Sequence, residues 1–85
     1  MYSIRFSPSA ARDYKKLPQQ EVNKINRAIN ELSVNPRIAG YKKLKDRDAY
    51  RIRVGDYRVI YEIHNREVTV IIIRIRHRRE VYRDL

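Results

Sequence analysis

Three arginines in one short stretch are the residues of this sequence best suited to chemistry. Within residues 50–63, runs of alternating polar and apolar residues lie on either side of Gly55-Asp56. This pattern predicts two antiparallel strands joined by a two-residue turn. In that register one face carries Arg51, Arg53 and Arg58. Like charges side by side destabilise a sheet, so their grouping predicts a surface that binds an anion.

Phosphate is the anion that such a surface fits best. Guanidinium groups bind phosphate oxygens through paired hydrogen bonds and stay charged at any working pH. They also suit phosphodiester cleavage, because preorganised cations stabilise the negative charge that builds in the transition state. The pattern leaves both roles, binding and catalysis, open. The other face of the hairpin predicts a core, with Tyr50, Ile52, Val54, Tyr57, Val59 and Tyr61.

Proton transfer needs a group other than arginine, because the pKa of a guanidinium lies far above neutral pH. His77 is the candidate, because it lies beside Arg78 near the end of the last predicted strand. His64 lies at a turn and is expected to be a surface residue. For Tyr82 two roles stay open: an RNA contact through its hydroxyl or ring, and a packing contact on the sheet.

Composition limits the remaining function classes. The chain has 85 residues, which predicts one domain over residues 1–85. It has no cysteine, no spaced cluster of metal ligands and no glycine-rich phosphate loop, so we expect no metal and no cofactor. No apolar run is long enough for a signal peptide or a membrane span, which predicts a cytoplasmic protein. The net charge of +10 predicts a polyanionic partner.

The elements that must position the arginines can be read in chain order. Residues 2–6 alternate and predict a first strand, and Ser7-Pro8 is typical of a helix start. We expect helices over 8–17 and 19–34, the second with an apolar stripe at helical spacing. That stripe consists of Val22, Ile25, Ile29 and Leu32.

The C-terminal half predicts the rest of the sheet. A turn at Asn65-Arg66 leads to a strand over 67–76, for which we expect two apolar faces. Val68, Val70 and Ile72 should face the core, and Thr69, Ile71, Ile73 and Ile75 should point away. The fold class is therefore α+β: an N-terminal strand, a helical hairpin, an antiparallel three-stranded meander, and a short C-terminal helix or tail.

Further basic residues surround the predicted hairpin. Residues 37–49 lack periodicity and are expected to form a loop, mostly solvated, whose lysines and arginine could line an RNA site. The candidates for RNA or ribosome binding are Lys42, Lys43, Lys45, Arg47, Arg76 and Arg79.

Two motifs resemble those of a known family, and the order of the predicted elements extends the similarity over essentially the whole chain. Residues 50–61, YRIRVGDYRVIY, resemble the signature hairpin of RelE-type toxins of the RelE/ParE superfamily, and residues 77–82, HRREVY, resemble their C-terminal motif. The resemblance implies a toxin of a type II toxin–antitoxin pair. Such toxins enter the ribosomal 30S A site and cut mRNA without metal, through attack of the 2′-hydroxyl on the adjacent phosphodiester. It also implies an acidic, RelB-like antitoxin as partner.

The resemblance assigns roles by position. Arg51 and Arg53 fall where some members have lysines that transfer protons, and Arg58 matches an arginine that grips the scissile phosphate. Arg78 most nearly matches a further catalytic arginine, with Arg76 as the alternative. Tyr82 matches a tyrosine that stacks on the mRNA.

Arginine at 51 and 53 supplies charge but is a poor base, which predicts weakened activity or a base role for His77. A ParE-like inhibitor of DNA gyrase without nuclease activity is the main alternative. An inactive relic or a plain RNA-binding module is the third.

Overall fold

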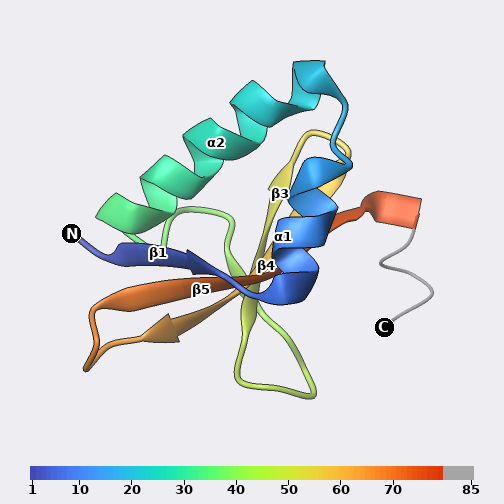
Figure 1. Ribbon diagram of the computed structural model, residues 1–85. Helices are drawn as coiled ribbons and strands as arrows, with labels where there is room; N and C mark the ends of the chain where they lie inside the picture. The colour runs from blue at the N-terminus through green and yellow to red at the C-terminus, as the bar shows by residue number, and fades with distance from the viewer. Residues whose placement is uncertain (80–85) are drawn as a thin grey trace.

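A mixed sheet with both helices on one side forms the protein (Figure 1). The computed structural model describes residues 1–79, and in that range the sheet has five strands in the order β1-β5-β4-β3-β2. β1 runs parallel to β5, and the other neighbours are antiparallel. The elements are β1 (Ser3–Phe6), α1 (Pro8–Lys15), α2 (Gln19–Val34), β2 (Lys42–Lys43), β3 (Tyr50–Val54), β4 (Tyr57–His64) and β5 (Thr69–His77).

The α+β class, the helical hairpin and the meander of β3, β4 and β5 are confirmed. The predicted C-terminal helix or tail lies mostly outside the described residues. In the part of the chain that the structure describes, no helix is both long and apolar enough to span a bilayer.

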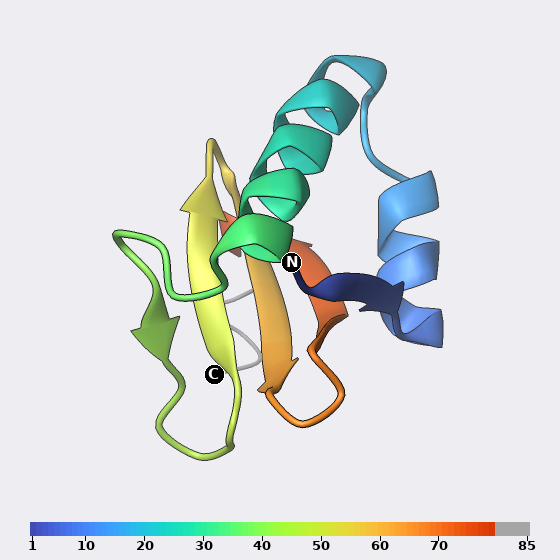
Figure 2. The same ribbon diagram turned by 90° about the vertical axis from the view of Figure 1, so that its left-hand side faces the viewer.

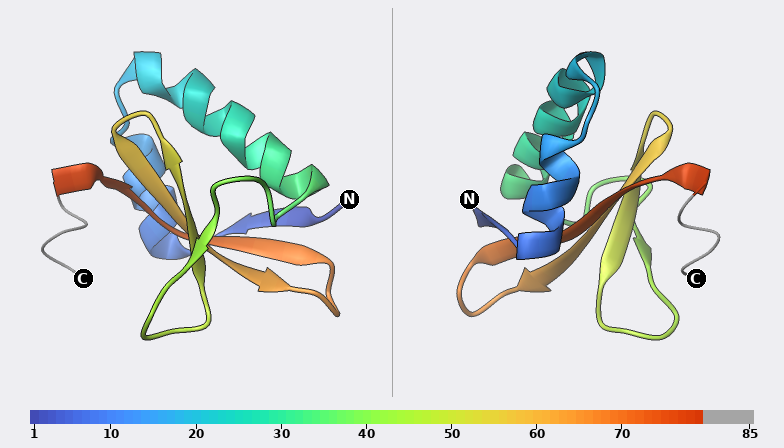
Figure 3. Two further views of the ribbon diagram at one scale, coloured as in Figure 1. Left: turned by 180° about the vertical axis from the view of Figure 1, so that it is seen from behind. Right: turned by 45° about the vertical axis from the view of Figure 1, so that its right-hand side comes forward.

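Both helices form for the reasons that the sequence indicates. The Ser7 hydroxyl caps α1 by accepting a hydrogen bond from the Ala10 amide at 3.0 Å, and Pro8 occupies the first turn. α1 ends at Lys15, two residues earlier than predicted. α2 spans the predicted residues and buries Ile25, Ile29 and Leu32 against the sheet. Figure 3 shows both helices on the same side of the strands.

The central hairpin has the predicted register. Arg53 lies opposite Arg58, with Val54 opposite Tyr57 and Ile52 opposite Val59. Gly55 takes φ of +59° in the turn, a conformation that side chains with a Cβ rarely adopt. The apolar face of the hairpin packs against the helices, as predicted.

Tyr61 is the largest fully buried side chain of this core. Its hydroxyl donates a hydrogen bond of 2.6 Å to the carbonyl oxygen of Pro36, just beyond α2. Burial raises the pKa of the Tyr61 hydroxyl above its usual value. The bond therefore anchors the end of α2 to the middle of the sheet.

The turn between β4 and β5 differs from the prediction. It spans residues 65–68 rather than two residues, and β5 begins at Thr69. Val68 takes φ of +48° and is 45% exposed, so its predicted core position was wrong. The alternating pattern did not distinguish an apolar turn residue from the first residue of a strand.

A β-bulge in β5 changes which residues face the core. Tyr61 pairs with Ile72 and Ile60 pairs with Arg74, which leaves Ile73 as an extra residue on β5. The alternation of side chains therefore reverses after Ile72. Ile75 is 3% exposed inside the core, so its predicted outward position was wrong.

Residues 37–49 are more ordered than a solvated loop. They include β2, which pairs with the start of β3 at the edge of the sheet (Figure 2). Leu44 and Ala49 are buried against Ile60 and Ile73 in a small second cluster. Since Ile60 lies between Val59 and Tyr61 of the core, this cluster covers the sheet face opposite the helices.

Candidate functional site

Three arginines from three neighbouring strands line up across the face of the sheet opposite the helices. Arg53 of β3 pairs with Arg58 of β4, and Arg58 pairs with Arg76 of β5. Directly paired side chains on a sheet lie on one face, with Cβ atoms about 5 Å apart. We call these three residues the arginine row. Arg53 and Arg58 were predicted to lie together, and the bulge adds Arg76 to them.

Arg58 is the most unusual member of the row. It is 7% exposed, and it is the one charged side chain that is buried among residues 1–79. Burying a charge is costly unless neighbouring groups compensate. The side chain of arginine carries its charge as a planar guanidinium group. The site thus holds a fixed positive charge in the centre of the sheet.

A second set of cations extends this face toward β2. Arg51 pairs with Ile60 on one side and with Lys42 of β2 on the other, so Lys42 and Arg51 share a face with the arginine row. The remaining candidates of this segment are exposed. Lys43 lies 3.9 Å from Asp48, and Arg47 lies 4.0 Å from Glu62. Such exposed ion pairs contribute little stability and leave the segment basic.

His77 lies on the other side of the sheet from the arginine row. It pairs with Tyr57, whose ring packs on the core, and the two rings meet edge to face at 5.3 Å. Its Nδ1 accepts a hydrogen bond of 3.3 Å from the Arg79 amide. The structure therefore does not bring His77 to the predicted phosphate surface.

The end of the described chain turns back over the hairpin. The Arg78 amide donates a hydrogen bond of 2.7 Å to the Asp56 carbonyl oxygen, and the side chains of Arg78 and Arg79 are exposed. Tyr82 lies outside the described residues.

One residue of the neighbourhood was missed from the sequence. Asp13 of α1 is 14% exposed and accepts hydrogen bonds from Arg74 Nε at 2.9 Å and from the Ile75 amide at 2.9 Å. A lone aspartate on a helix gives no signal of contacts 61 residues away. Only the pairing of α1 with β5 in space reveals them.

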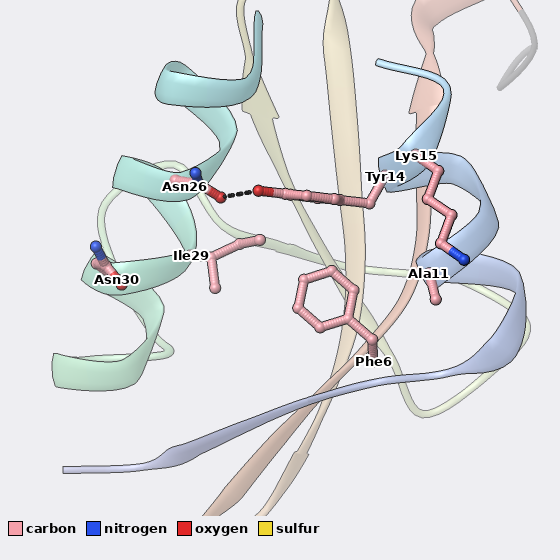
Figure 4. A pocket seen from close by; sticks show the side chains of 7 residues that line it. All are labelled: Phe6, Ala11, Tyr14, Lys15, Asn26, Ile29 and Asn30. Atoms are coloured by element: carbon pink, nitrogen blue, oxygen red, sulfur yellow. Dashed lines mark hydrogen bonds between the residues drawn. The ribbon is translucent and has the colours of Figure 1, made fainter. Parts of the chain in front are cut away.

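A hollow away from the arginine row lies between α1, α2 and β1 (Figure 4). It has a volume of about 470 Å³ and is lined by Phe6, Tyr14 and Ile29 among others. The Tyr14 hydroxyl crosses it to donate a hydrogen bond of 2.7 Å to Asn26 Oδ1. It contains none of the predicted site residues and lies on the helix side, so it is not the candidate site.

The arrangement supports charge stabilisation more directly than proton transfer. Guanidinium groups of the arginine row can bind phosphate oxygens with defined geometry. Within residues 1–79, no group of three or more histidine, cysteine, aspartate or glutamate side chains could hold a metal ion.

Known proteins resemble this chain in sequence and in fold. Residues 4–82 match the family described as the ParE toxin of the type II toxin–antitoxin system parDE. The chain is 36% identical to "Toxin RelG" of Mycobacterium tuberculosis, with 96% of this chain and 97% of RelG covered. It is 28% identical to "mRNA interferase toxin RelE" of Escherichia coli, with 98% and 92% covered.

A solved structure shares the fold. The toxin–antitoxin complex RelBE2 from Mycobacterium tuberculosis contains a chain that superposes with a TM-score of 0.79 at 33% identity. The match covers 89% of this chain and 96% of that one.

Proposed function

Since this chain belongs to the ParE toxin family of type II toxin–antitoxin systems, we propose that it is a toxin that cleaves mRNA in the ribosomal A site. The observation that carries the proposal is the arginine row, with Arg58 buried at its centre. Similarity to proteins named mRNA interferases supports the same activity. A stabilised row of like charges fits a substrate that carries the opposite charge.

The proposed reaction uses the RNA as its own nucleophile. The 2′-oxygen forms a bond to the adjacent phosphorus, and the bond from that phosphorus to the 5′-oxygen breaks. The products are a 2′,3′-cyclic phosphate and a 5′-hydroxyl. The 2′-hydroxyl loses a proton and the leaving 5′-oxygen gains one. Negative charge builds on the phosphorane oxygens after the bond to the 2′-oxygen forms and before the bond to the 5′-oxygen breaks. Cations of the protein can stabilise this charge.

Arg58 and Arg76 are the residues that we assign to the phosphorane. Arg58 is buried in the sheet, and Arg76 is its direct neighbour on β5. This placement favours Arg76 over Arg78 as the further catalytic arginine. Arg53 completes the row, and Arg51 with Lys42 supplies positive charge for flanking phosphates. Tyr82 keeps its predicted role of stacking on the mRNA.

Proton transfer is the part of the reaction for which the described residues offer the fewest suitable groups. Arginines do not titrate near neutral pH, and His77 faces the helix side with Tyr57. We therefore propose that the protein supplies charge and alignment. The 2′-hydroxyl proton leaves to water or to a ribosomal group, and water or a ribosomal group gives a proton to the leaving 5′-oxygen. Slow cleavage that accelerates steadily with pH is the expected signature.

An acidic, RelB-like antitoxin is the proposed partner. Structural neighbours of this chain include toxin–antitoxin complexes, and the net charge of +10 favours an acidic polypeptide. Such a partner would cover the arginine row and keep the toxin inactive.

The decisive experiment is a cleavage assay with translating ribosomes. The purified protein is added to ribosomes programmed with a defined mRNA, and cleavage sites are mapped by primer extension. We expect cuts within A-site codons and little cutting of the same mRNA without ribosomes. The control is the protein bound to its antitoxin.

Absence of cleavage would refute the proposal. The family match carries the ParE name, so inhibition of DNA gyrase is the second candidate. Gyrase-dependent double-strand breaks in plasmid DNA, without mRNA cleavage, would establish it in place of the first.

A further inference from the structure

Within residues 1–79, the second half of β5 has no strand neighbour on one side. β1 pairs with β5 only from Ser3–Thr69 to Phe6–Ile72. Beyond Ile72, the bulge and the residues that follow it have β4 on one edge and α1 on the other. A strand edge without a neighbouring strand leaves backbone groups in need of partners, and α1 is the element that lies along this edge.

Residues around α1 take over the role of the missing strand. The Ser7 amide donates to the Ile72 carbonyl oxygen at 2.9 Å, and the Ser7 hydroxyl donates to the Ile73 carbonyl oxygen at 2.8 Å. Asp13 then accepts from the Ile75 amide at 2.9 Å. The contacts follow the bulge residue by residue, in the order Ile72, Ile73 and Ile75.

Asp13 also binds the side chain of Arg74, which lies between Ile73 and Ile75. Its carboxylate accepts from Arg74 Nε at 2.9 Å and from Arg74 Nη2 at 3.3 Å, a paired arrangement that fixes the guanidinium. Asp13 is 14% exposed, so this pair is less screened by water than a surface pair. Arg74 immediately follows the extra residue of the bulge, and Arg76 of the arginine row is two residues further.

We propose that Asp13 is a positioning residue, which locks the bulged register of β5 and thereby keeps Arg76 beside Arg58 in the arginine row. The inference rests on the proposed function for its catalytic consequence, but its structural part is independent of it. Without the bulge, strand alternation would place Arg76 on the helix side and Ile75 on the outer face. Burial of Ile75 in the core opposes that change, so loss of Asp13 should loosen the register rather than unfold the protein.

Kinetics give the first test. In the ribosome assay, Asp13→Asn keeps an acceptor for the Ile75 amide but loses the charge facing Arg74, whereas Asp13→Ala loses both. We expect kcat to fall by roughly 10- to 100-fold with KM changed less than about twofold, and more for Ala than for Asn. Assays are run where circular dichroism shows each variant fully folded, so a purely stabilising role would leave kcat unchanged.

A double variant tests whether Asp13 acts through its arginine. If the two side chains act together, Asp13→Asn with Arg74→Gln should be no slower than Asp13→Asn alone. The matched control is Glu31→Gln, which makes the same chemical change on the exposed side of α2 and should behave as the wild type. Additive losses at residues 13 and 74 would contradict the coupling.

Hydrogen exchange and nuclear Overhauser effects give a readout without activity. The Ile75 amide should be protected in the wild type and exchange at least about tenfold faster in Asp13→Ala. Cross-strand effects between the Tyr57 and His77 rings, 5.3 Å apart, should weaken in parallel. Unchanged exchange and ring contacts in both variants would overturn the proposal. If the wild type cleaves no mRNA but the variants still show faster exchange and weaker ring contacts, the proposed function is refuted and the positioning role of Asp13 stands.

Discussion

The two faces of the sheet follow opposite rules. The helix face gathers apolar side chains, among them Ile52, Val59 and Tyr61, each at most 4% exposed. The other face sets Arg53, Arg58 and Arg76 side by side. Burial explains the first face, because each apolar side chain removed from water stabilises the fold. On the second face, like charges side by side oppose folding, whereas the small cluster of Leu44, Ala49 and Ile60 on the same face supports it.

The bulge is what keeps the two faces distinct at the end of β5. One extra residue, Ile73, moves Ile75 into the core and Arg76 onto the arginine face. A regular strand would have done the reverse for both. A single insertion thus serves packing and the proposed site together, and substitutions on either face should have effects of different kinds.

The largest expected effect is on the arginine face. Arg58→Ala should lower ribosome-dependent cleavage by about 10²–10³-fold, the usual loss when one charge-stabilising group is removed. The measurement is the rate of mRNA cleavage, together with growth arrest on induction. Arg58→Lys is the companion variant and should recover part of the rate, because it keeps the charge without the paired geometry. Full activity of Arg58→Ala would remove the arginine face from the mechanism.

The next effect belongs to the helix face and tests the bulge. Ile75→Ala should lower the free energy of unfolding by about 2–5 kcal/mol, because it leaves a cavity in the core. Ile73→Ala should cost clearly less, since Ile73 is only partly buried against the small cluster of Leu44, Ala49 and Ile60. Urea denaturation measures both. Equal losses, or a larger loss at Ile73, would contradict the bulged register.

A smaller effect concerns the anchor between the core and α2. Tyr61→Phe keeps the ring and removes the hydrogen bond to the Pro36 carbonyl oxygen. The buried acceptor then lacks its partner, which should cost about 1–3 kcal/mol of unfolding free energy. Thermal unfolding provides the measurement, and Tyr50→Phe is a control on the neighbouring strand. Cleavage activity should stay near the wild-type level in both.

The smallest effect should have the opposite sign. Arg53→Gln removes one of two directly paired like charges and should stabilise the fold by about 0.2–1 kcal/mol, while it slows cleavage. Urea denaturation at low and high salt checks the cause, because screening should shrink the gain. A destabilised Arg53→Gln protein would show that the arginine face supports the fold.

Local signals explain what the sequence could predict. The Gly55-Asp56 turn and its flanking alternation determine the hairpin register, and the cap at Ser7 determines the start of α1. The grouping of Arg51, Arg53 and Arg58 on one face followed directly. In each case the residues that decide the structure are neighbours along the chain.

The features that were missed depend on contacts distant in sequence. Ser7 and Asp13 contact β5 at the bulge, and Leu44 and Ala49 are buried on the sheet face opposite the helices. The bulged register of β5 is what places Arg76 in the arginine row and His77 on the opposite side of the sheet. The role of Tyr82 stays a prediction, because it lies outside the described residues.

The parallel pairing of β1 with β5 has a consequence for the order of folding. Ser7 bonds to Ile73, 66 residues later in the chain. During synthesis, which proceeds at about 5–20 residues per second, β1 and α1 emerge long before their partner strand exists. Such non-local pairing slows folding, and the sheet can close only after β5 has been made. Arg76 lies near the end of that strand, so the arginine row cannot form until nearly all of residues 1–79 have been synthesised.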